Sequence, residues 1–212
     1  MSEAFIYVVF TSTPCGVGRF LRTVTRYHYN HVSVSLSPRL TPLYSFARYY
    51  KNAPFYGGFV QESLLRYQNG ERCADALVCA VPLSAHQAER AREFLSGVEG
   101  EADRYVYNML SAACFPLRHR VLIENSFTCV EFAVRVLAES GSEDSPGRDD
   151  FCTVRQLAER LRRYAVYEGP ITRYLEGADW AQDAFMTQNS LWRRTRLTLN
   201  ANRRLLGMWR RG

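Results

Sequence analysis

The sequence has no apolar stretch that approaches the roughly 18 uninterrupted residues needed for a membrane-spanning helix. Its first ten residues carry no basic leader, and the short β-branched run at residues 4–10 is typical of a first strand, not of a secretion signal. We therefore expect a cytoplasmic protein.

Paired cysteines and clustered histidines are also lacking. The six cysteines contain no Cys-x-x-Cys pair, and the four histidines are scattered along the chain. A cytoplasmic protein keeps such cysteines reduced, and zinc requires grouped ligands. We therefore expect free thiols, no structural metal and no cofactor.

What the chain does contain is enough apolar sequence for one full core. Several strands are predicted before the main helices instead of alternating with them, which favours an α+β fold with an antiparallel sheet packed against helices. The predicted strands cover residues 5–11, 31–36, 43–49, 74–82 and 164–167. The predicted helices cover residues 19–26, 88–95, 105–115 and 153–163, and a further helix begins at Thr128. Residues 54–60 and 139–150 are expected to be loops.

The clearest local signal surrounds Cys129. Thr128 and Glu131 form a Thr-x-x-Glu capping box, Phe127 and Phe132 occupy the two positions of a hydrophobic staple, and a glycine follows the last periodic residue. Cys129 is therefore predicted to be the first residue of a helix. The helix dipole and the unpaired amides at that end favour a thiolate, although full activation needs a second group such as an imidazole.

His31 is the histidine with the most informative setting. It begins a strictly alternating strand and shares a face with Ser33 and Ser35, opposite the two valines of that strand. A polar face of this kind can line a cleft, so His31 is our candidate general base. His28, three residues earlier in a less regular stretch, is the next candidate.

A catalytic imidazole needs an orienting partner on its other nitrogen. A hairpin around Pro38 would bring Ser45 roughly opposite His31, so Ser45 is the candidate for this third role, although a shift of one residue would turn it away. Glu62, Asn30 and backbone carbonyls remain alternatives.

Four segments together resemble one family. They are residues 30–34 (NHVSV), 43–48 (LYSFAR), 57–60 (GGFV) and 127–132 (FTCVEF). Their order resembles the circularly permuted branch of the papain-like cysteine peptidases, which includes the NlpC-like cell-wall peptidases and the lecithin:retinol acyltransferase-like proteins. The resemblance spans roughly residues 4–141 and implies a permuted papain-like domain over residues 1–178, with Cys129 as nucleophile and His31 as base. Many members carry a glutamate or histidine as the third group, whereas the predicted returning strand here has no acid.

The resemblance implies covalent acyl transfer through a Cys-His pair, without a cofactor. The leading prediction is a thiol hydrolase of peptide or amide bonds. A lipid acyltransferase or phospholipase using the same pair is the first alternative, and a non-catalytic binding module on the same fold is the second. Either enzyme would take a peptide, amide or acyl substrate.

The last part of the chain, residues 179–212, is predicted to be a basic helical tail. Residues 184–212 hold seven arginines and no acid. Because the net charge of the whole chain is +6, the remainder of the chain carries 6 − 7 = −1. Helical spacing places one set of residues on a basic face, namely Arg193, Arg196, Asn200, Arg203, Gly207 and Arg210. The other face holds Leu191, Thr195, Leu199, Asn202, Leu206 and Trp209. Such a helix suits an anionic membrane surface, an acidic partner, or docking on its own domain; nucleic acid is not expected, because no recognition motif accompanies the charge.

Overall fold

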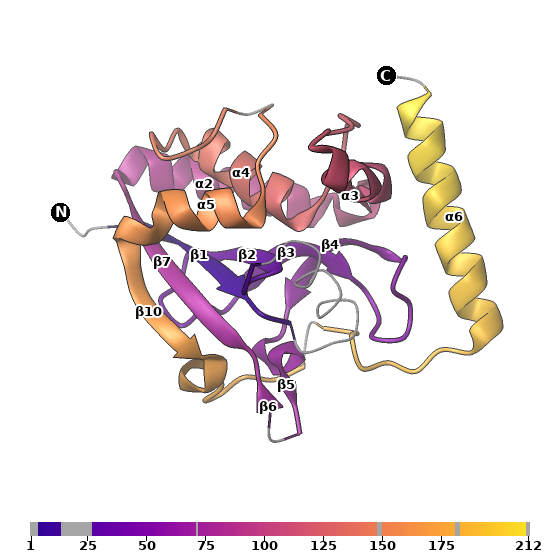
Figure 1. Cartoon of the computed structure of the whole chain (residues 1–212), viewed down its shortest axis with the longest axis horizontal. Helices are drawn as coiled ribbons and strands as arrows, with labels where there is room; N and C mark the ends of the chain where they lie inside the picture. Colours follow the sequence, from indigo (N-terminus) through magenta and orange to yellow (C-terminus); the bar gives the residue numbers. More distant parts are fainter. Residues whose placement is uncertain (1–3, 14–26, 71, 148–149, 181–182, 211–212) are drawn as a thin grey trace.

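The computed structural model describes residues 4–13, 27–70, 72–147, 150–180 and 183–210. Its centre is a six-stranded antiparallel sheet with the strand order β10–β7–β1–β2–β3–β4 (Figure 1). The strands are β1 (Ala4–Thr11), β2 (His31–Ser35), β3 (Leu43–Arg48), β4 (Gly57–Glu62), β7 (Asp75–Leu83) and β10 (Ala165–Pro170). Two short pairs complete the strands, β5 (Gln68–Asn69) with β6 (Arg72–Cys73) and β8 (Val106–Tyr107) with β9 (Ser126–Phe127).

The described part of the chain has five α-helices. They are α2 (Ala85–Gly100), α3 (Met109–Cys114), α4 (Cys129–Ser140), α5 (Val154–Leu161) and α6 (Leu191–Trp209). Short 3-10 turns are η1 (Leu64–Tyr67), η2 (Ala102–Arg104), η3 (Phe115–Leu117), η4 (Arg162–Tyr164) and η5 (Ile171–Tyr174). The α+β class with an antiparallel sheet packed against helices is thus confirmed.

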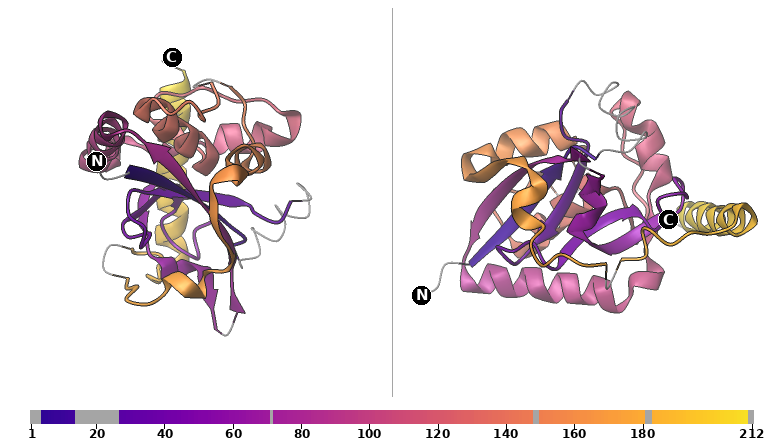
Figure 2. Two further views of the ribbon diagram at one scale, coloured as in Figure 1. Left: turned by 90° about the vertical axis from the view of Figure 1, so that its left-hand side faces the viewer. Right: turned by 90° about the horizontal axis from the view of Figure 1, so that it is seen from below.

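The two faces of the sheet carry different layers. Helices α2, α4 and α5 cover one face, where they share a core with alternate residues of the strands such as Val8, Phe10, Val32 and Val34 (Figures 1 and 2). The intervening residues point to the opposite face, where Val9 packs in a second core with residues of η1 and η5. The alternation of β2 therefore places His31 and Ser33 on the sheet face opposite Val32 and Val34, as the sequence pattern predicts.

Two element boundaries differ from the sequence prediction in ways that shape the site. Residues 57–62 form strand β4, although the paired glycines indicate a loop. A Cβ atom on Gly57 would lie 2.4 Å from the carbonyl oxygen of Ala47, so this glycine permits close strand packing instead of a turn. The predicted helix over 105–115 is helical only from Met109 to Cys114, because residues 106–107 pair with β9.

The predicted helix over residues 19–26 lies outside the described residues. Among the residues that the structure does describe, we find no helix with the length and hydropathy needed to cross a bilayer.

Candidate active site

Helix α4 presents Cys129 at its first position. The Thr128 hydroxyl accepts a hydrogen bond from the amide of Glu131 at 3.4 Å, and the Glu131 carboxylate accepts one from the Thr128 amide at 2.7 Å. Gly141, in the left-handed conformation with φ of 76°, ends the helix. The rings of Phe127 and Phe132 lie 6.4 Å apart, as expected for the staple. The capping box, the staple and the glycine stop are all confirmed.

His31 at the start of β2 contacts both Cys129 and Glu62. Its imidazole forms a side-chain hydrogen bond with Cys129, and its Nε2 lies 3.0 Å from Oε1 of Glu62. Burial favours the neutral imidazole, but the negative charges of Glu62 and Cys129 outweigh burial and raise the pKa of His31 from 6.5 to about 10. Since Nε2 is engaged by the carboxylate, Nδ1 is the nitrogen left for the sulfur.

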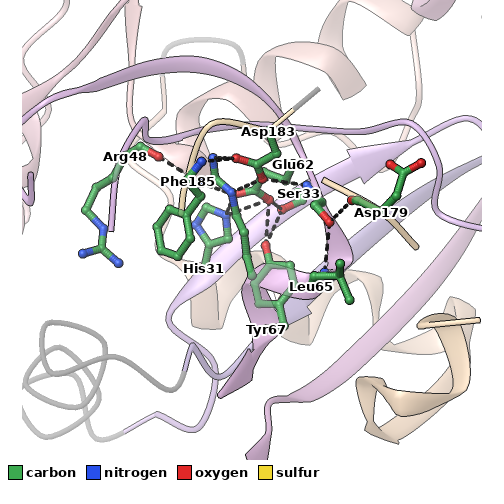
Figure 3. A network of polar contacts seen from close by, with 11 residues as sticks. His31, Ser33, Arg48, Glu62, Leu65, Tyr67, Asp179, Asp183 and Phe185 are labelled. Atoms are coloured by element: carbon green, nitrogen blue, oxygen red, sulfur yellow. Dashed lines mark hydrogen bonds and ion pairs between the residues drawn. The ribbon is translucent and has the colours of Figure 1, made fainter. Parts of the chain in front are cut away.

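Glu62 lies at the centre of a buried polar network (Figure 3). Its Oε2 accepts hydrogen bonds from the hydroxyls of Ser33 at 2.6 Å and Tyr67 at 2.7 Å, and its Oε1 lies 3.6 Å from Nη1 of Arg66. Burial opposes ionisation of this carboxyl, but the His31 and Arg66 charges and the donated hydrogen bonds lower its pKa well below 4.5. Glu62 is therefore a fixed anion that holds the imidazole in position.

A segment from near the C-terminus secures this network. The Asp183 carboxylate forms an ion pair with the Arg66 guanidinium and accepts hydrogen bonds from the amides of Ser63 and Phe185, each at 2.8 Å. Arg66 also lies over the ring of Phe185, with 4.5 Å between its Cζ and the ring centroid. Both charged groups of the pair are almost fully buried. The sequence predicts that residue 183 belongs to the tail, yet through Arg66 it supports the polar network around Glu62.

His31, Glu62 and Cys129 line a pocket of about 570 Å³. Most of its other side chains are apolar, and they come from β3, the loop before β4, α3 and the segment before α6: Phe46, Pro54, Phe55, Met109, Trp180, Phe185 and Met186. Arg48 and Lys51 add positive charge to the lining. A volume of this size accepts a small molecule or a few residues of a peptide.

Tyr107 on β8 lines the same pocket. Burial, reinforced by the negative charges of Cys129 and Glu131, raises its pKa well above 10. The Tyr107 hydroxyl therefore keeps its proton at neutral pH.

The structure brings together Cys129 and His31 but places Ser45 elsewhere. Val34 pairs with Tyr44, so the strand register directs Ser45 towards Ser33 instead of His31. The Ser45 hydroxyl is fully buried and has no hydrogen-bond partner among the described residues. The position expected for Ser45, against the imidazole, is occupied by Glu62, which the sequence left as one of several alternatives.

His28, the second histidine candidate, does not contribute to this pocket. Its Nε2 lies 3.0 Å from Asp75 Oδ2, and both side chains are about half exposed. Within the described residues no three His, Cys, Asp or Glu side chains converge in a way that could hold a metal ion.

Sequence reasoning missed Tyr107 and Asp183 altogether. Nothing local marks either residue, because each reaches the site only through pairing or docking with distant segments. Glu62 did leave a signal, since it is an acid at the end of an apolar run and precedes Ser63, which caps the next turn.

Comparisons with family models, curated proteins and solved structures found no match for this chain.

Proposed function

We propose that the protein is a cysteine hydrolase that cleaves a peptide or amide bond through a covalent acyl-enzyme. The observation that carries the proposal is the arrangement of His31, whose imidazole contacts Cys129 on one side and the buried Glu62 carboxylate on the other. A nucleophile, a base and an orienting anion in this order form the recurring constellation of thiol and serine hydrolases.

The assignment to the permuted papain-like superfamily is part of this proposal. In support of it, the histidine precedes the cysteine in sequence, the cysteine begins a helix packed on an antiparallel sheet, and an acid completes the triad. This acid comes from β4 and not from the returning strand β3. Its presence weakens the case for a non-catalytic binding module, which rested on the lack of a third group.

In the proposed reaction the Cys129 thiolate attacks the substrate carbonyl and forms a carbon–sulfur bond. The helix amides at the start of α4 and the Tyr107 hydroxyl stabilise the negative oxygen. The His31 imidazolium gives its proton to the leaving amine as the carbon–nitrogen bond breaks. Water then attacks the thioester, His31 accepts a proton from that water, and the acid product leaves as Cys129 returns to the thiolate.

A second candidate is transfer of a lipid acyl group through the same Cys129 thioester. The mostly apolar lining of the pocket, which includes Phe46, Met109 and Phe185, favours this alternative because it suits a hydrocarbon chain. Water or another nucleophile would then release the acyl group.

The first test is alkylation of the native protein by iodoacetamide at neutral pH, mapped by peptide mass spectrometry. We expect Cys129 to react faster than the four other cysteines described, Cys73, Cys79, Cys114 and Cys152, which serve as internal controls. Burial raises the pKa of Cys79 to about 12 and that of Cys152 to about 11, so both should react slowly. A His31→Ala variant that alkylates Cys129 at the native rate would contradict the proposed pair.

The second test identifies the acyl group. The protein and its Cys129→Ser variant are incubated with cell extract, and the mass added at residue 129 is measured. A peptidyl or aminoacyl mass supports the amide hydrolase, whereas a fatty-acyl mass supports the alternative. A slow thiol together with no adduct would contradict both enzymes and favour a binding module.

A further inference from the structure

Helix α6 stands at the side of the molecule with one face against the body (Figures 1 and 2). On that inner face Leu205 is 1% exposed and packs with Val106 and Ile123. Arg194 donates a hydrogen bond from Nη1 to the carbonyl of Asn52 at 2.8 Å, and Asn202 donates one to the carbonyl of Phe55 at 3.5 Å. These contacts fix the orientation of the helix, so its outer face is also defined.

One exposed side of α6 differs from an ordinary solvent-exposed helix surface because large apolar side chains recur along its length. Five large side chains are exposed there, with fractions from 39% to 71%: Leu191, Trp192, Leu199, Leu206 and Trp209. At 100° per residue all five fall within one stripe about 100° wide, roughly a quarter turn from the docked side that carries Leu205 and Arg194. The side predicted to be apolar is therefore exposed at Leu191, Leu199, Leu206 and Trp209. Its Asn202 contacts the body through Phe55, and Leu205, on the neighbouring side, is the leucine that docks.

Exposed arginines run beside the apolar stripe. Arg196, Arg203 and Arg210 recur every seven residues and lie along its edge, while Arg193 extends the basic surface further round. Residues 184–212 contain no acid that could neutralise them through short-range pairs within the helix. A stripe of leucine and tryptophan with a parallel row of arginines is the arrangement of helices that lie in the interface of a membrane.

We propose that α6 binds the surface of an anionic lipid bilayer, with the five apolar side chains inserted between headgroups and the arginines paired with lipid phosphates. Trp192 and Trp209 lie near the two ends of the helix, and tryptophan favours the interface between hydrocarbon and water. The helix is 19 residues long, which corresponds to about 28 Å of contact along the bilayer plane. A continuous contact of this length suits a flat anionic surface better than an acidic site on a folded protein.

The docked position of α6 connects this surface to the candidate active site. Phe55, whose carbonyl accepts the hydrogen bond from Asn202, is 58% exposed and lines the pocket beside Cys129. Met186, just before α6, is 52% exposed and lines the same pocket. A bilayer along α6 would therefore lie beside the rim of the pocket.

The test is flotation of the full chain with vesicles of phosphatidylcholine alone and of phosphatidylcholine mixed with phosphatidylglycerol. We expect strong binding only to the anionic vesicles, weakened by added salt. Replacing Arg196 and Arg203 by glutamine should lower the partition coefficient by about 30-fold, because each arginine near an anionic surface contributes about 1 kcal/mol. The matched control replaces the exposed Arg39 and Arg160, which are far from α6 in sequence, by glutamine. This control should bind anionic vesicles as well as the native protein does.

The apolar stripe is tested by Leu199→Ser with Leu206→Ser, against Val166→Ser, which removes a side chain 57% exposed on β10. Only the α6 variant should lose binding. Tryptophan fluorescence should shift to the blue on adding anionic vesicles, and Trp192→Phe with Trp209→Phe should abolish the shift while Trp180 still reports the folded state.

Three results would overturn the proposal. The first is no flotation with anionic vesicles, and the second is vesicle binding that survives both sets of α6 substitutions. The third is a protein that does not bind vesicles but forms a dimer, which the leucine substitutions dissociate. The inference does not depend on the proposed chemistry. A Cys129→Ser variant should bind vesicles as well as the native protein, so failure of either proposal leaves the other standing.

Discussion

The Nε2 atom of His31 lies 3.0 Å from Oε1 of Glu62, and the two side chains are 12% and 2% exposed. The pair joins the start of β2 to the end of β4, two strands separated in the sheet by β3. Buried charges persist only when they are paired and hydrogen-bonded. Glu62 meets that condition through His31, Arg66, Ser33 and Tyr67, so the carboxylate that orients the imidazole is itself held by three other side chains.

Replacing Glu62 by glutamine should slow alkylation of Cys129 at neutral pH by about tenfold or more, since each unit of pKa lost by His31 changes its protonation equilibrium tenfold. Glutamine keeps the shape of the side chain but removes the charge that favours the imidazolium. The matched control is Ser33→Ala, which removes one hydrogen bond to Glu62 and leaves its charge, and which should alter the rate much less. Equal rates in the native protein and in Glu62→Gln would contradict the role of Glu62.

The His31–Glu62 pair also predicts how stability depends on pH. His31 has a raised pKa in the folded state, so its contribution is complete below 6.5 and is lost as the pH rises towards about 10. Glu62 has a lowered pKa, so its contribution is present above 4.5 and is lost on acidification. Both contributions are therefore present together between these two ordinary values.

This dependence can be isolated by urea unfolding of the native protein and a His31→Gln variant at several pH values. The difference in the free energy of unfolding should shrink above pH 6.5, by up to about 1.4 kcal/mol per pH unit for the one proton involved. A difference that stays constant or grows with pH would show that the imidazole is not held as a cation in the folded protein.

Sequence patterns were sufficient for the residues whose positions depend on their neighbours in the chain. Thr128, Glu131 and a following glycine specify the start and end of α4, and the alternation of β2 specifies the face of His31. Two strong local signals thus predicted where Cys129 and His31 lie in their elements. The antiparallel α+β class followed from the order of strands and helices.

The same patterns failed where the position of a residue depends on pairing between segments that are distant in the sequence. An assumed hairpin predicts Ser45 opposite His31, but the observed pairing of Val34 with Tyr44 sets Ser45 opposite Ser33, and Glu62 at the end of β4 contacts the imidazole instead. Asp183 reaches Arg66 over 117 positions of sequence, and no periodic pattern records a contact of that kind.

Asp183 should be required for the shape of the site as well as for stability. Its replacement by asparagine removes the charge that pairs with the buried Arg66, and breaking such a pair costs about 3–5 kcal/mol. Released from Asp183, Arg66 can approach Glu62 and compete with His31 for that carboxylate. We expect a lower melting temperature and slower alkylation of Cys129, whereas Glu176→Gln, an exposed change of the same type nearby in sequence, should affect neither. Native behaviour of both variants would refute this role.

A Tyr107 variant can distinguish two parts of the proposed mechanism, the stabilisation of the oxyanion and the activation of the thiol. Tyr107→Phe removes one hydroxyl donor from the pocket, and loss of one such donor typically slows acyl transfer by about 10²–10³-fold. Hydrolysis of an activated ester such as p-nitrophenyl acetate should fall by this order, while iodoacetamide, whose reaction forms no oxyanion, should alkylate Cys129 at nearly the native rate. Parallel losses in both assays would instead indicate that Tyr107 supports the fold.

The last prediction separates the local role of α4 from its contribution to stability. Thr128 and Thr153 are both threonine N-caps in complete capping boxes, the first at Cys129 and the second at α5. Replacing either by alanine should lower the free energy of unfolding by about 1 kcal/mol, because one amide of the first turn loses its acceptor. Urea unfolding should therefore rank the two variants together.

Their effect on the thiol should differ. In Thr128→Ala the first turn of α4 loosens at the residue that carries the sulfur, so Cys129 spends less time against His31 and its alkylation slows. Thr153→Ala leaves that turn intact, because α5 packs on the rest of the core and its cap contacts Gln156 rather than the pocket. If both variants slow alkylation equally, global stability controls the thiol; if only Thr128→Ala does, the capping box positions the nucleophile.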